Sequence, residues 1–403
     1  MNIIAPNYIL TPDILLKNQA IAFDKIIKKI APIDELKKEF PNANIIKLQK
    51  NSLLMPGLIN AHVHIEFSAN KTELSYGDFI NWLYSVIENR EELIKGCDNF
   101  CMKSAIDSML SSGITTFGAV SSHAMDLQAC AKAKQNVVFF NELIGSQANM
   151  ADALFNDFLS RLDDSKSIKR DGFYPAVAIH SPYSVHPILI KKALKLVKDE
   201  NLKLTAHFME SKAERDWLDN SGGKFKEFFT TLLNQTSNLS SADEFLKHFD
   251  NYETLMTHVT NAKKSELETI AKNNHTVIHC PISNRLLGNP TLNIKELNDK
   301  NINWVVATDG LSSNYQLDLF EEMKVSLFMH SDAPLLEFAK ALIRGVTINP
   351  AKALGLNTGE IKEGKNADMI ILDLDKEPNE ELAIHLILHK YNISNIYING
   401  KRV

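Results

Sequence analysis

The sequence predicts an α/β protein in which a (β/α)8 TIM barrel carries a small β-sandwich domain formed by both chain termini. Three observations lead to this prediction. From about residue 53, short apolar runs alternate with longer amphipathic stretches, which is typical of βα units and a parallel sheet. Several of these runs are apolar at nearly every position, as in strands that helices cover on both faces. Short β-type runs return near both ends of the chain.

Eight runs are expected to form the barrel strands, at residues 52–59, 114–120, 136–143, 174–179, 203–208, 253–257, 276–279 and 303–308. Amphipathic stretches such as 101–111 and 188–199 have helical periodicity and lie between them. The polar segments 221–223 and 234–241 are expected to be loops, the second of them inside a long insertion before the sixth strand.

The β-domain is expected to draw on two separate parts of the chain, residues 1–55 and residues 355–403, with the barrel at 56–354 between them. In the first part, β-type runs at 20–23 and 44–48 flank a charged segment at 33–39. In the last part, apolar runs at 369–374 and 396–398 precede the turn signal Asn399-Gly400. We expect these runs to pair into one domain beside the barrel.

Composition limits the partners and the compartment. The 403 residues carry a net charge of −5 and show no clustered positive charge, which argues against a nucleic-acid partner. The four cysteines form no C-x-x-C pair, and the N-terminal stretch lacks a basic segment followed by an apolar one. No apolar run approaches the roughly 18 residues of a membrane span. We therefore expect a cytoplasmic protein with a small-molecule substrate and no membrane partner; assembly into a homo-oligomer stays open.

Histidines and carboxylates follow six of the eight expected strands. A lone histidine in a strand is more often a core residue, and for His279 that alternative stands beside a role in substrate binding. The set as a whole indicates an active site, because barrel enzymes carry their active sites at the carboxyl ends of the strands. Its members, in chain order, are His62, His64, His180, His207, Glu210, His258, His279 and Asp309.

These residue types suit a metal site. Alternate residues of a strand point to the same side, so His62 and His64 can offer two imidazoles to one ion. Imidazole nitrogens together with one carboxylate suit zinc or ferrous iron. Such an ion lowers the pKa of a water molecule toward about 7. The sequence therefore predicts a metal-dependent hydrolase.

The motifs also carry a family resemblance. The segment PGLINAHVH at 56–64 resembles the first metal motif of the amidohydrolase superfamily, and the later motifs follow in the same order over nearly the whole chain. Within the superfamily, the chain is most similar to the mononuclear deaminases of adenosine-type compounds and to the related triazine chlorohydrolases. The later motifs are HSPYSVHP (180–187), HFMES (207–211), THVT (257–260), HCPISN (279–284), TDGLSSN (308–314) and the tail GEIKEGKNADMIILD (359–373).

The resemblance implies a role for each site residue. Binuclear members place a carboxylated lysine after strand four, where this chain has His180, so one zinc or iron ion per chain is implied. Glu210 would be the proton shuttle, His258 would orient the hydroxide, and Asp309 would also help to move a proton to the leaving amine. His180 and Glu88 would contact a ribose, although Glu88 has the alternative of an exposed helix charge. The implied metal ligands are His62, His64, His207 and Asp309.

The resemblance also bears on the substrate. Adenosylhomocysteine deaminases carry arginines after strand three, and the stretch 139–150 has none. Together with the aromatic surface of Trp82 and Tyr84, this ranks aminofutalosine, a menaquinone precursor with a benzoate-bearing tail, above methylthioadenosine and adenosylhomocysteine.

Two other functions stay open. One is a triazine-type chlorohydrolase or another amidohydrolase that uses the same water, although Glu210 favours deamination. The other is a metal-free assembly protein that is not an enzyme, against which the complete ligand set argues.

Overall fold

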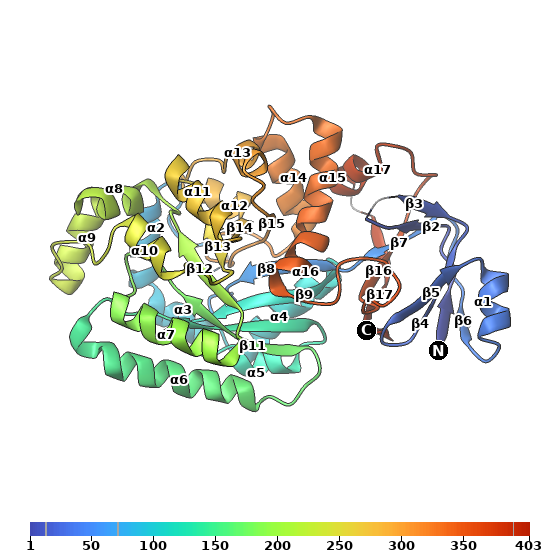
Figure 1. Cartoon of the computed structure of the whole chain (residues 1–403), viewed down its shortest axis with the longest axis horizontal. Helices are drawn as coiled ribbons and strands as arrows, with labels where there is room; N and C mark the ends of the chain where they lie inside the picture. Colours follow the sequence, from blue (N-terminus) through green and yellow to red (C-terminus); the bar gives the residue numbers. More distant parts are fainter. Residues whose placement is uncertain (13, 71, 390) are drawn as a thin grey trace.

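The barrel is the larger part of the structure, a computed structural model that describes residues 1–12, 14–70, 72–389 and 391–403. Eight parallel strands form one sheet in which each strand pairs with its neighbour in the chain, and helices surround it (Figure 1). The predicted eight-stranded barrel is confirmed. Its strands are β8 (Leu58–Val63), β9 (Ile114–Ser121), β10 (Asn136–Leu143), β11 (Phe173–Ile179), β12 (Leu204–Phe208), β13 (Leu255–His258), β14 (Thr276–His279) and β15 (Trp304–Val306).

Polar contacts join the last strand of the barrel to the first. The Asn60 side chain donates to the Thr308 hydroxyl at 2.7 Å and accepts from the Thr308 backbone N–H at 3.1 Å. One step further along, the Asp309 N–H donates to the His62 carbonyl at 3.2 Å. These contacts bring Asp309 beside His62, although the two residues are far apart in the sequence.

The helices pack their apolar faces on the outside of the barrel. Helix α7 shows why they form: the His186 side chain caps its first turn, Pro187 occupies the first helical position, and Asn201 ends it in the left-handed conformation. The helices of this part are α2 (Phe79–Glu88), α3 (Arg90–Gly96), α4 (Asn99–Ser111), α5 (Leu127–Lys132), α6 (Ala151–Ser167), α7 (Pro187–Glu200), α8 (Lys212–Asn220), α9 (Lys224–Leu233), α10 (Ala242–His248), α11 (Lys264–Lys272), α12 (Pro281–Leu286), α13 (Ile294–Asp299), α14 (Leu319–Met329), α15 (Leu335–Gly345) and α16 (Ile348–Leu354).

The predicted insertion before the sixth strand is helical. It comprises α8, α9 and α10, and the two polar segments predicted as loops are the connections between these helices. Helices α8 and α9 lie at the end of the molecule opposite the chain termini (Figure 1). None of the described helices has both the length and the apolar character that a membrane crossing requires.

Two sheets form the β-sandwich. One has the order β5-β4-β1-β6 and comes from the N-terminal part alone, whereas the other, β18-β17-β16-β7-β2-β3, combines strands from both ends of the chain. Apolar residues of both sheets form one core between them, and helix α1 (Ile33–Glu39) covers the outer face of the first sheet. The strands are β1 (Asn2–Ile4), β2 (Tyr8–Leu10), β3 (Leu15–Lys17), β4 (Ala20–Phe23), β5 (Ile27–Ala31), β6 (Asn44–Ile46), β7 (Ser52–Pro56), β16 (Met369–Asp373), β17 (Asn392–Ile398) and β18 (Lys401–Arg402), with helix α17 (Leu382–Leu388) between β16 and β17.

The predicted first barrel strand at 52–59 was wrong. This apolar run contains parts of two strands, because β7 pairs with β16 and β2 in the sandwich and the barrel begins only at Leu58. The chain passes from one sheet to the other at Gly57, where a β-carbon would lie 2.2 Å from the Thr115 hydroxyl oxygen. His62 consequently lies within the first barrel strand, not after it.

Candidate active site

Four residues implied as metal ligands lie together at the carboxyl end of the barrel. The His62 ring centroid is 4.9 Å from the centroids of both His64 and His207. Asp309 Oδ1 lies 3.7 Å from Nε2 of His62 and 3.7 Å from Nε2 of His64. One nitrogen from each of the three histidines lies within 4.8 Å of the others. The barrel thus brings together residues from β8, β12 and the loop after β15.

The hydrogen bonds of these histidines leave nitrogens available for an ion. His207 Nδ1 is 3.0 Å from the His180 carbonyl, so it carries the proton and Nε2 is unprotonated. His62 Nε2 is buried and has no hydrogen-bond partner among the described residues. Burial lowers the pKa of both His62 and His207, which keeps the rings neutral, as metal ligation requires. Three imidazoles and one carboxylate therefore form a donor set that fits a divalent zinc or iron ion.

Two serines that the sequence analysis did not single out hold Asp309. Ser283 and Ser313 donate to Oδ2 at 2.7 and 2.9 Å, while the Gly310 N–H donates to Oδ1 at 2.8 Å. Burial alone would raise the pKa of Asp309, but its interactions with the neighbouring rings of His62, His64 and His258 hold that pKa well below its usual range. The carboxylate therefore stays ionised and fixed in orientation. Both serines lie inside the motifs HCPISN and TDGLSSN, and these motifs were the feature of the sequence that could have identified them.

Glu210 and His258 form an acid–base pair next to these ligands. Glu210 Oε1 lies 3.5 Å from His258 Nε2. Burial raises the pKa of Glu210 well above its usual value, with the Asp309 and Glu214 charges adding to the effect. Burial lowers the pKa of His258 to about 4, and its Nδ1 lies 2.9 Å from the Asn284 side-chain oxygen. The raised pKa favours a carboxyl group that holds a proton, and the lowered pKa favours an imidazole that is free to accept one.

The backbone at this site is strained. Met209, His258 and Asp309 have φ angles of +51°, +73° and +58°, in the left-handed region that residues with side chains adopt rarely. Glu214 stabilises the first of these turns, because its carboxylate accepts the backbone N–H groups of Met209 and Glu210 at 3.0 and 2.7 Å. Such strain persists only where surrounding contacts enforce it, and it concentrates at functional sites.

His180 faces the same site as a neutral base. Its Nδ1 contacts the hydroxyls of Ser181 and Ser184 at 3.0 and 2.6 Å, so Nε2 is the nitrogen available to a substrate. Burial lowers the pKa of His180. Trp82 is half-buried and its Nε1 donates to the Ser312 carbonyl at 2.9 Å, which packs α2 against the loop that carries Asp309.

The structure does not bring two predicted residues into this group. Glu88 is exposed at the last position of α2, which matches the alternative interpretation of an exposed helix charge. His279 is fully buried and contacts the His330 ring of α14, with ring centroids 5.4 Å apart. Its neighbour Ile278 belongs to the barrel interior, so the alternation of the strand turns His279 toward the helices. Asn284 connects it to the site, because Asn284 lies 3.5 Å from Nδ1 of His279 and 2.9 Å from Nδ1 of His258.

Glu142 is a site residue that the sequence analysis missed. It lies near the end of β10 and is 1% exposed, and its Oε1 is 3.8 Å from His207 Nδ1. Together with His180 and His207 it forms a second group of ligand-type atoms within 4.8 Å of one another. No motif marks Glu142, because it lies in a largely apolar strand whose sequence is typical of a buried core strand.

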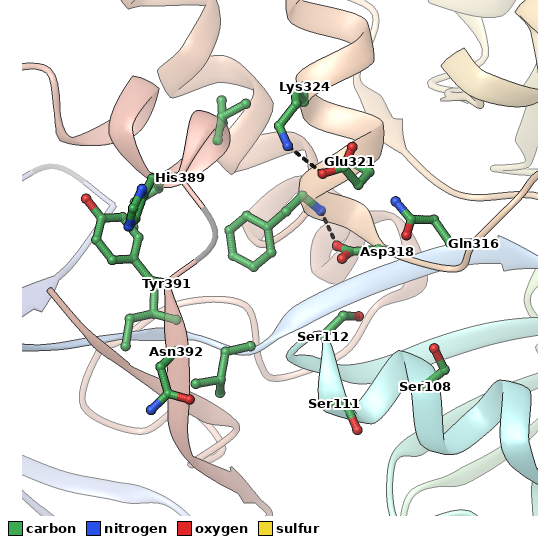
Figure 2. Close-up of a pocket in the computed structure, with 15 residues that line it drawn as sticks. Ser108, Ser111, Ser112, Gln316, Asp318, Glu321, Lys324, His389, Tyr391 and Asn392 are labelled. Atoms are coloured by element: carbon green, nitrogen blue, oxygen red, sulfur yellow. Dashed lines mark hydrogen bonds and ion pairs between the residues drawn. The ribbon is translucent and has the colours of Figure 1, made fainter. Parts of the chain in front are cut away.

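A separate cavity of about 590 Å³ lies between the barrel and the sandwich, lined by residues of α4, α14, β16 and β17. Two of its charged groups form an ion pair, because Figure 2 shows the Lys324 amine directed at Glu321, while the Asp318 side chain caps α14. None of the residues predicted for the active site lines this cavity. We assign no function to it.

Comparison with known proteins shows the family of this chain. The model of the amidohydrolase family matches residues 53–403. The aminodeoxyfutalosine deaminase of a Nitratiruptor species is 47% identical over 403 residues, which cover 100% of this chain and 99% of that protein. The crystal structure of Helicobacter pylori aminofutalosine deaminase in complex with methylthio-coformycin matches with a TM-score of 0.93 and 33% identity, over 100% of both chains.

A more distant structure shares the fold alone. Atrazine chlorohydrolase from Arthrobacter aurescens TC1, complexed with zinc, matches with a TM-score of 0.82 at 18% identity, over 100% of this chain and 95% of that one. This similarity shows that a zinc-bound protein has the same fold. It does not show which group leaves in the reaction of this chain.

Proposed function

This chain belongs to the amidohydrolase family, and from that premise we propose that it is a metal-dependent hydrolytic deaminase of adenosine-type nucleosides. It would convert the 6-amino group to a 6-oxo group and release ammonia. The observation that carries the proposal is the acid–base pair: Glu210, a buried carboxyl that can hold a proton, lies 3.5 Å from neutral His258 beside the metal-type ligands. Ring deamination needs both a proton for the heterocycle and a base for water.

One divalent metal ion, zinc or iron, would be held by His62, His64, His207 and Asp309. When bound, such an ion supplies Lewis-acid chemistry that makes a water molecule easier to deprotonate at neutral pH. The protein orients two of these donors through contacts described above: Ser283 and Ser313 hold Asp309, and the His180 carbonyl holds His207.

The chain's own residues account for the proton transfers. His258, neutral and anchored by Asn284, accepts a proton from the attacking water through Nε2. Glu210 gives its proton to the ring nitrogen next to the amino-bearing carbon, which makes that carbon electrophilic. A C–O bond forms from the water oxygen. Asp309 then helps to carry the remaining proton of the new hydroxyl group to the amine, the C–N bond breaks as the 6-oxo group forms, and ammonia leaves. His258 returns its proton to Glu210, which lies 3.5 Å away.

The proposed substrate is aminofutalosine, with methylthioadenosine as a poorer one. Two findings support this choice: the whole-chain identity of 47% to an aminodeoxyfutalosine deaminase and the whole-chain match to an aminofutalosine deaminase structure. The aromatic surface around Trp82, where its ring contacts Phe79 at 5.5 Å between centroids, suits a large 5′ group. No arginine lies within 139–150 to bind an α-carboxylate.

A panel of 5′-substituted adenosines tests this proposal. We expect kcat/KM to be highest for aminofutalosine, lower for methylthioadenosine and lowest for adenosylhomocysteine, because the last presents a charged amino-acid tail with no guanidinium partner on this stretch. Atrazine is the comparison compound, and we expect its dechlorination to be negligible. Ammonia release together with loss of the adenine ultraviolet band measures each rate. Preference for atrazine over every nucleoside would overturn the proposal.

A further inference from the structure

We propose that Glu142 accepts a hydrogen bond from a sugar hydroxyl of the substrate and forms, with His180, a subsite for the ribose diol. The proposal rests on the nucleoside deamination proposed above. It replaces Glu88 as the carboxylate partner of the ribose.

The barrel directs Glu142 into the site. Phe140 and Val138, two and four residues before Glu142 on β10, belong to the apolar interior of the barrel. Side chains alternate along a strand, so Glu142 points to the same interior, at the carboxyl end where the histidines lie. Its carboxylate lies within 4.8 Å of a ring nitrogen of His180.

One oxygen of this carboxylate has no partner. Oε2 accepts the Ser122 hydroxyl at 2.5 Å, which fixes the orientation of the group. Oε1 is buried and forms no hydrogen bond with any described residue. The nearby His207 Nδ1, at 3.8 Å, already donates to the His180 carbonyl. A buried acceptor without a donor is costly, so this oxygen favours a donor that a ligand brings into the site.

The chemistry of the pair matches a vicinal diol. A carboxylate oxygen can only accept, and a sugar hydroxyl can donate to it. Next to it, the Nε2 of neutral His180 can exchange a hydrogen bond with the adjacent hydroxyl, because Nδ1 is engaged by Ser181 and Ser184. Two such groups side by side recognise two hydroxyls on neighbouring carbons.

Glu88 does not offer this arrangement. It is exposed at the end of α2, and no other member of the site contacts it in the described structure. Glu142 is fixed by Ser122 before the substrate binds, so less entropy is lost when the hydroxyl pairs with it.

The test combines variants with substrate analogues. Glu142→Gln, Glu142→Ala and Glu88→Gln are assayed with methylthioadenosine and with its 2′-deoxy and 3′-deoxy counterparts. Glu337→Gln, an exposed glutamate on α15, is the matched control. For each variant, kcat and KM, metal content, melting temperature and calorimetric binding of the 6-oxo product methylthioinosine are measured.

We expect both Glu142 variants to lower kcat/KM for methylthioadenosine by about 10- to 100-fold, as for loss of a hydrogen bond to a charged group. The change should appear chiefly in KM and in product affinity. With the analogue that lacks the contacted hydroxyl, the loss should shrink to about threefold or less, because that hydrogen bond is already missing. Metal content and melting temperature should match the Glu337→Gln control.

Several results would overturn the inference. One is an equal loss with all three substrates, which indicates a structural role. Another is loss of the metal in Glu142→Gln, which indicates a role in metal retention. A third is substrate-dependent loss in Glu88→Gln in place of the Glu142 variants. If the metal-loaded wild-type protein deaminates none of the three compounds, the proposed function fails instead.

Discussion

We expect Glu210→Gln to lower kcat for aminofutalosine by about 10²- to 10⁴-fold while the metal stays bound, as is typical when a positioned acid or base is removed. Glutamine keeps the size and the hydrogen-bonding shape of the side chain but has no proton to give to the ring nitrogen. Glu210 is not among the residues that form the metal-type donor set, so that set should survive the change. Steady-state kinetics and elemental analysis of the same preparation measure both effects.

The control for this variant is Glu268→Gln, because Glu268 is an exposed glutamate whose side chain pairs with Lys300 and not with any residue of the candidate site. It should leave kcat and metal content unchanged. A metal-loaded Glu210→Gln enzyme with wild-type kcat would remove Glu210 from the mechanism. Loss of the metal in that variant would instead give Glu210 a structural role.

Free adenine should react at least about 10⁴-fold more slowly, in kcat/KM, than the preferred nucleoside. A site built to hydrogen-bond substrate hydroxyls rejects a compound that lacks them, because its buried polar groups are then left unpaired. Here those groups are Glu142 Oε1, which has no partner in the described structure, and His180 Nε2. The same ammonia assay measures both compounds.

The comparison compound for this prediction is 9-methyladenine, which blocks the nitrogen that carries the sugar but offers no hydroxyls. It should react as poorly as adenine, so that the discrimination is traced to the sugar and not to the substituted nitrogen. Adenine within about tenfold of the nucleoside would contradict a ribose-binding site.

Most of the fold could be predicted because the barrel strands are apolar and regularly spaced. The run at 136–143 and the run at 276–279 have the bounds that the structure gives them. The run at 52–59 failed because apolar character alone cannot tell which of two sheets a strand joins. The strand pairings show that the chain changes sheets between Pro56 and Leu58, at Gly57, which approaches Thr115 closely.

The candidate site could be predicted where a motif or a strand end marked it, and not elsewhere. His62 and His207 come from such positions, and the structure brings them together. His279 also lies at the end of a strand, but its side chain points away from the barrel interior, because neighbouring residues of a strand point to opposite faces. Glu142 lies within an apolar strand, where the sequence gives no sign of a site residue. Its orientation depends on a hydrogen bond from Ser122, and no sequence pattern connects these two residues.

Titration of the metal-free protein with zinc or iron(II) tests the central claim most directly, because it links the donor set to the reaction. We predict that the metal-free protein releases no ammonia from aminofutalosine. Activity should then rise in proportion to added metal and reach a plateau at about one ion per chain, the stoichiometry of a site with three imidazoles and one carboxylate. Ammonia release without metal, or a plateau at two ions per chain, would contradict a deaminase built on one metal ion held by His62, His64, His207 and Asp309.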